Sequence, residues 1–266
     1  MPLHLDAITK DSQNPALVKQ LLEISNSIMD SFFITEDKKY QHMQKVIIDT
    51  LTMQAIGKIV ITTKETENVS SLELIDADIM FDACMPTTVC FVEMIDGSSD
   101  ANEYYEIATE SMDQHLIIET VNRHTIPNDI LGESRDVYAS IFPFELTVYE
   151  SIDTYNRQFT LPVNGINGFS DTFTMFTPGS EGHPSYTHLF GTVKSFRDVQ
   201  IQFGSIPIRF VLAQVHTALG LTPVAMSRDV FDLTQLRVGC LLTMSADVKL
   251  DLADPTIFTN IHSEKD

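Results

Sequence analysis

The chain has 266 residues, of which 43% are hydrophobic and 20% are charged, and its formal net charge is −20. This apolar content argues against a disordered protein and is enough for one large core or two smaller ones. The negative charge argues against nucleic acid and anionic lipid as partners, because both are bound through an excess of Lys and Arg.

The N-terminal region favours two helices. Asn14 followed by Pro15 is typical of a helix start, and apolar residues at helical spacing predict a helix over residues 15–33. A second apolar stripe between Thr35 and Gly57 predicts another helix after a short turn. Such a helical hairpin must bury its apolar faces, so we expect it to pack on a sheet.

Strands are expected to follow the hairpin. Residues 58–63, 70–81 and 87–95 are rich in β-branched or alternating apolar side chains and predict three strands. A capping-box pattern predicts a helix over residues 100–113. Residues 115–121 predict a further strand. The first half is therefore expected to be an α+β layer.

The second half is expected to be mainly β. The periodicity weakens around residue 130, which predicts an acidic α+β domain over residues 1–130 and a β-rich domain over residues 131–266. Strands are expected at 144–149, 158–163, 169–176, 188–193, 199–203, 208–216, 221–226 and 238–250. The last five would form a small barrel, similar in architecture to OB-like or SH3-like barrels. No repeat is apparent in the sequence.

Acidic residues are concentrated in one segment. Residues 65–122 contain fourteen Asp and Glu and no Lys or Arg. The spacing does not match an EF-hand, so we interpret these carboxylates as a water-facing surface that docks a basic protein. A cation site is the alternative. The candidate binding residues are Asp76, Asp78, Asp82, Asp96, Asp100 and Glu103.

A second candidate site is the segment 181–188. His183 and His188, with Glu181, could bind a transition metal and support a metal-assisted hydrolase. A mobile surface loop explains the same residues. The motifs of serine nucleophiles, phosphate-binding loops and dinucleotide-binding folds are absent.

Isolated residues carry weaker signals. Cys84, Cys90 and Cys240 form no close pair, which favours buried thiols in a reducing compartment. Arg209 and Lys249 interrupt apolar strands, and we interpret them as pointing to solvent, with an anion in a barrel mouth as the alternative.

Together these features favour a non-enzymatic, cytoplasmic, adaptor- or chaperone-like protein that binds a basic protein partner. No cofactor, nucleic acid or membrane is expected, and a homo-oligomer is possible in principle. Two alternatives stay open: the metal-assisted hydrolase, and a structural subunit of a viral or phage particle.

Overall fold

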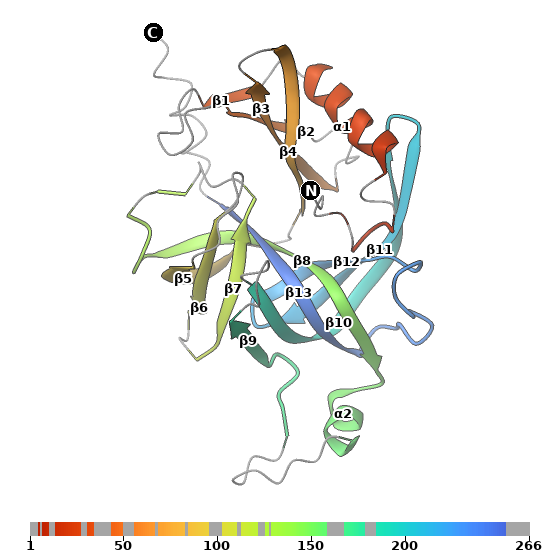
Figure 1. Cartoon of the computed structure of the whole chain (residues 1–266). Helices are drawn as coiled ribbons and strands as arrows, with labels where there is room; N and C mark the ends of the chain where they lie inside the picture. The colour runs from red at the N-terminus through yellow and green to blue at the C-terminus, as the bar shows by residue number, and fades with distance from the viewer. Residues whose placement is uncertain are drawn as a thin grey trace.

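A computed structural model describes residues 5, 7–10, 14–27, 31–34, 44–49, 56–66, 69–82, 85–95, 103–110, 113–121, 126–127, 129–158, 168–178 and 185–253. Strands dominate this part of the chain (Figure 1). The helices are α1 (Pro15–Ser27) and α2 (Ile152–Gln158). The strands are β1 (Ser31–Ile34), β2 (Gln44–Asp49), β3 (Gly57–Thr66), β4 (Val69–Phe81), β5 (Thr87–Ile95), β6 (Tyr104–Thr109), β7 (His115–Thr120), β8 (Ser134–Tyr149), β9 (Thr174–Pro178), β10 (Ser185–Phe203), β11 (Ile206–Thr217), β12 (Gly220–Met226) and β13 (Leu241–Leu252).

The predicted α+β fold with an N-terminal helical hairpin is wrong. The first helix is confirmed, and the Asn14 side chain caps it by accepting a hydrogen bond from the backbone N–H of Ala16 at 2.9 Å. This helix ends at Ser27, and β1 takes the place of the last residues predicted to be helical, whereas the region of the second predicted helix contains β2. The run Val46-Ile47-Ile48 explains the difference, because consecutive β-branched residues favour a strand over a helix.

The helix predicted over residues 100–113 is also wrong, because β6 occupies its centre. Tyr105 and Ile107 point into the main core, and strands β5 and β7 pair with β6 on its two sides. Further along the chain, α2 ends at Gln158, where a strand was predicted to begin, and one continuous strand, β10, replaces two predicted strands.

The larger sheet closes into two rings that share strands β8 and β13. The first ring runs β8–β5–β6–β7–β13, and the second runs β13–β10–β11–β12–β8. Strands β8 and β13 pair along most of their length and cross the centre of the molecule (Figure 1). Closure satisfies the backbone groups that an open sheet would leave unpaired at its edges.

The two rings follow the same chain path, so the fold contains an internal repeat. In the first repeat, a meander β5–β6–β7 leads to the long strand β8; in the second, a meander β10–β11–β12 leads to β13. Each meander's first strand pairs antiparallel with its own long strand. Each meander's last strand pairs parallel with the long strand of the other repeat.

The strand registers match residue by residue. Thr88 lies opposite Asp136 in the first repeat, as His188 lies opposite Ser245 in the second. Lys249 of β13 lies opposite Ser140 of β8 where the shared strands pair. The correspondence that relates Asp136 to Ser245 also relates Ser140 to Lys249, so these two paired residues are equivalent to each other. The approximate two-fold axis that relates the repeats therefore passes through this pair.

A smaller sheet, β1–β2–β3–β4, packs on the outside of this double ring together with α1 (Figure 1). The core beneath it contains Leu17 and Leu21 from α1, Ile59 and Phe81 from the small sheet, and Phe210 from β11. A separate core fills the rings. Burial of these two apolar faces holds the layers together.

Strands on both sides of residue 130 share the larger sheet, since β5, β7 and β13 all pair with neighbours across that position. The predicted domain boundary stays a prediction. In the described ranges, neither helix has the length and apolar character needed to cross a bilayer.

Candidate functional site

A cavity of about 320 Å³ lies on the outer face of the second ring, and we call it the aromatic pocket. Strands β8, β10 and β13 form its floor, and side chains of α2 and of the segment before β9 form its walls. Its lining residues are Glu145, Leu146, Thr147, Tyr155, Phe169, Phe173, Met175, His188, Phe190, Thr243, Met244 and Ser245. This size is within the usual range of sites for small organic ligands.

Four aromatic rings pack against one another in the pocket wall. Phe190 on β10 contacts Tyr155 of α2, with ring centroids 4.9 Å apart, and Phe173, at 5.6 Å. Phe169 packs on Phe173 at 4.7 Å. Most of these contacts are edge-to-face or tilted, so the rings form a mutually supported wall. Burial raises the pKa of the Tyr155 phenol above its ordinary value.

Three polar side chains form a hydrogen-bonded chain along the floor. The Ser245 hydroxyl donates to Oε2 of Glu145 at 3.0 Å and lies 2.7 Å from Nδ1 of His188. Since the serine hydrogen is used by Glu145, Nδ1 of His188 must carry the hydrogen that joins it to Ser245. In the tautomer with its one hydrogen on Nδ1, Nε2 is an acceptor. Ser245 is buried, whereas Glu145 is exposed at the rim.

This order of residues does not build a nucleophile. In a catalytic triad the histidine lies between the serine and the carboxylate and removes the serine proton. Here the serine lies in the middle and donates directly to the carboxylate. The arrangement instead fixes the orientation of Glu145 and His188, and so presents a carboxylate and a ring nitrogen beside an aromatic wall.

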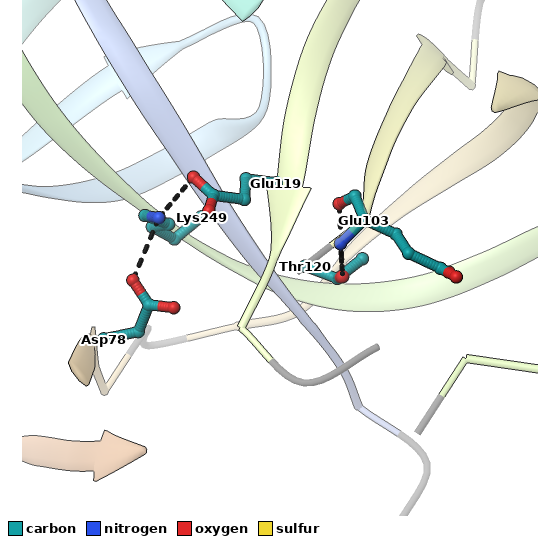
Figure 2. A network of polar contacts seen from close by, with 5 residues as sticks. All are labelled: Asp78, Glu103, Glu119, Thr120 and Lys249. Atoms are coloured by element: carbon teal, nitrogen blue, oxygen red, sulfur yellow. Dashed lines mark hydrogen bonds and ion pairs between the residues drawn. The ribbon is translucent and has the colours of Figure 1, made fainter. Parts of the chain in front are cut away.

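The predicted acidic surface is wrong for Asp78, which is buried rather than exposed to water. Its carboxylate lies 2.9 Å from Nζ of Lys249, and Lys249 also forms an ion pair with Glu119 (Figure 2). All three side chains are at most 2% exposed. The prediction that Lys249 points to solvent is therefore wrong as well. Two carboxylates around one ammonium compensate its loss of hydration.

The cluster of Asp78, Lys249 and Glu119 joins three parts of the fold. Asp78 comes from β4 in the small sheet, Glu119 from β7 and Lys249 from the shared strand β13 (Figure 2). Nearby Tyr104 is buried, and its pKa is raised by burial and then by the negative charge of Glu119. The cluster is inaccessible to a ligand, so we interpret it as structural.

The other predicted acidic residues do not form one surface with Asp78. Asp82 is exposed just after β4, and the half-buried Glu103 accepts a hydrogen bond from the Tyr105 hydroxyl at 2.6 Å. Thr120 binds the backbone of Glu103 (Figure 2). For Asp76 only the backbone in β4 is described, and Asp96 and Asp100 lie outside the described residues. Their role in binding a partner stays a prediction.

Of the predicted metal ligands, His188 lies in β10 and binds Ser245. His183 and Glu181 lie outside the described residues, so the metal hypothesis stays a prediction. Within the described ranges, no three His, Cys, Asp or Glu side chains are grouped as a metal site would require. Arg209 is exposed, as predicted, and donates a hydrogen bond to Gln200 at 2.8 Å.

Most of the pocket is formed by contacts that the sequence does not reveal. Glu145 and Ser245 are 100 residues apart and meet only because β8 pairs with β13. Phe169 and Phe173 lie in the segment 169–176, for which the sequence predicts a strand rather than the wall of a pocket. A cluster of aromatic residues next to a turn-rich segment is a signal that could have suggested a binding site.

No protein-family model matches the chain, and no curated protein or solved structure matches it.

Proposed function

We propose that the protein is a non-enzymatic binding protein whose aromatic pocket takes a ligand with a flat apolar ring and a cationic amine. The observation that carries this proposal is the pairing of an aromatic wall with a fixed, exposed carboxylate in one cavity. Pockets that combine apolar walls with a few oriented polar groups are typical of sites for organic ligands.

The ligand's charge follows from the groups that face the pocket. Glu145 supplies a negative charge at the rim, and Nε2 of the His188 imidazole is a hydrogen-bond acceptor in the tautomer that carries its hydrogen on Nδ1. Aromatic faces also attract cations. The net charge of −20 adds a favourable long-range field for a cation and an unfavourable one for an anion. A ring bearing an amine satisfies all of these groups.

Tryptamine is a suitable probe, because the chain contains no Trp and the probe's indole fluorescence is distinct. We expect saturable binding of tryptamine to the full chain, weaker binding of neutral indole, and the weakest binding of indole-3-acetate. Glu145→Gln keeps the shape of the rim but removes its charge. It should lower tryptamine affinity by about tenfold while leaving indole affinity within about twofold, the change expected for one charged hydrogen bond.

Two phenylalanine variants separate the pocket from general surface adhesion. Phe173→Ala removes one wall and should weaken both tryptamine and indole. Phe196→Ala truncates a partly exposed ring elsewhere on β10 and should change neither. Equal effects of the two substitutions, or equal affinity for the amine and the acid, would contradict the proposal.

A further inference from the structure

The internal repeat places a second cavity at the position equivalent to the aromatic pocket. This cavity has a volume of about 670 Å³ and is lined by Pro86, Pro127, Ser134, Arg135, Asp136, Tyr138, Leu252 and Ala253. The register makes Ser134, Arg135 and Asp136 of β8 equivalent to Thr243, Met244 and Ser245 of β13, which line the first pocket. The two cavities therefore share this three-residue segment of the backbone framework, and the rest of their linings differs.

A side-chain hydrogen bond marks the same point in each cavity. Thr88 donates to Oδ1 of Asp136 at 2.7 Å, where the other repeat has His188 bound to Ser245. At the rim of the aromatic pocket, Glu145 lies opposite Ser245. At the rim of the second cavity, Ala253 lies opposite Asp136, and the backbone N–H of Ala253 donates to the carbonyl of Asp136. The framework is retained, but the groups that would face a ligand have changed.

These groups favour a neutral ligand with many hydroxyls. Arg135, which pairs with Glu133, and Asp136 place a guanidinium and a carboxylate in the same wall, so neither an anion nor a cation meets charge of one sign alone. Nε of Arg135 is a buried donor with no hydrogen-bond partner among the described residues. The half-buried Tyr138 offers a phenol ring in place of the four packed rings of the first pocket.

We infer that this second cavity, next to Asp136, binds a neutral sugar. Sugar hydroxyls can donate to Asp136 and accept from the donors of the wall, and the C–H face of the sugar ring can lie on Tyr138. A neutral ligand is not repelled by the net charge of −20. The inference does not depend on the aromatic pocket, because the two cavities share no lining residue.

A tryptophan placed in the cavity wall tests the inference. The chain has no Trp, so Tyr138→Trp introduces a single reporter, and Tyr149→Trp introduces a matched reporter at the other end of β8. Glucose, galactose and maltose serve as probes. At least one sugar should change the emission of the Tyr138→Trp protein saturably, and none should change that of the Tyr149→Trp protein. Adding Asp136→Ala to the Tyr138→Trp protein should lower its affinity for the sugar about tenfold or more, because a site that binds through hydrogen bonds loses much of its binding free energy when one partner is removed.

The side-chain Nε–H resonance of Arg135 gives a second readout in the unmodified protein, which covers the case in which Tyr138→Trp disturbs folding. The same sugar should shift this resonance saturably, and tryptamine should leave it unchanged. The inference is overturned if no sugar shifts it, if Asp136→Ala leaves the affinity unchanged, or if phosphate shifts it as strongly as the sugars do.

Discussion

Thr87 and Thr187 occupy equivalent positions in the two repeats, and each hydroxyl donates a hydrogen bond to a backbone carbonyl of the other repeat. Thr87 binds the carbonyl of Leu219, just before β12, at 2.5 Å, and Thr187 binds the carbonyl of Ile117 in β7 at 2.9 Å. Each bond lies where the first strand of one meander meets the last strand of the other. The two threonines therefore form two equivalent hydrogen bonds between the rings.

Thr187→Val should destabilise the protein more than Thr87→Val. The Thr187 hydroxyl is buried and also accepts from the N–H of Ile117 at 3.1 Å, so its loss leaves two buried backbone groups unpaired. We expect a loss of about 2–4 kcal/mol for Thr187→Val and about 1 kcal/mol for Thr87→Val. Urea unfolding of both variants measures the difference. Equal losses would show that the Ile117 contacts are not stabilising.

Lys249→Met should be strongly destabilising, because it removes the ammonium that forms ion pairs with the buried carboxylates of Asp78 and Glu119. The expected cost is about 3–5 kcal/mol. Lys194→Met at an exposed position of β10 is the control and should change stability by less than about 0.5 kcal/mol.

Neutralising all three members of the ion cluster should restore much of this loss. The triple variant Lys249→Met, Asp78→Asn and Glu119→Gln removes all three charges of the cluster together. The triple variant should therefore be more stable than Lys249→Met alone in chemical denaturation. A triple variant less stable than the single one would contradict a structural role based on charge compensation.

High pH should destabilise the protein through Tyr104. Its folded-state pKa is raised above the ordinary value of 10.0, mainly by burial, so the folded protein holds a proton that the unfolded chain releases. This stabilising contribution is fully present below pH 10.0 and is lost progressively as the pH rises above that value. Tyr104→Phe removes the ionisable group. Its urea midpoint should fall less steeply with pH in this range than that of the unmodified protein, and parallel profiles would refute the assignment.

Gly191→Ala should destabilise the second ring. A Cβ atom at Gly191 would lie 2.4 Å from Cγ1 of Val215 and 2.9 Å from Cγ2 of Thr217, both on buried side chains of β11. The equivalent residue of the first repeat is Phe91, which fills its ring by packing against Tyr105. We expect a cost of about 1–3 kcal/mol from overpacking, measured by thermal or urea unfolding. Unchanged stability would show that β10 and β11 can separate freely here.

Local signals predicted several elements correctly. The cap formed by Asn14 and the β-branched or alternating segments that became β3, β4, β5 and β7 were readable because neighbouring residues determine them. The error at β6 arose because Tyr104 and Ile107, three residues apart, have helical spacing, whereas Tyr105 and Ile107, two residues apart, have the spacing of one face of a strand. Only pairing with β5 and β7 decides between these two conformations.

The burial of charged residues and the composition of the pocket depend on distant contacts. Lys249 is surrounded by residues from β4 and β7, and neither contact can be inferred from its own apolar strand. His188 was identified as a candidate, but its partner Ser245 is 57 residues away in sequence. The internal repeat is likewise visible in the strand register rather than in residue identities. Thr87 and Thr187 are an example of equivalent positions that carry the same residue.

The most direct test of the account is the position of bound tryptamine. Intermolecular nuclear Overhauser effects between the indole protons of tryptamine and the protein locate the ligand without any substitution. We expect contacts from the indole to Phe169, Phe173 and Phe190, with the amine side of the ligand towards Glu145. Contacts confined to the surface around Phe196, or saturable binding with no contact to the three pocket phenylalanines, would contradict it.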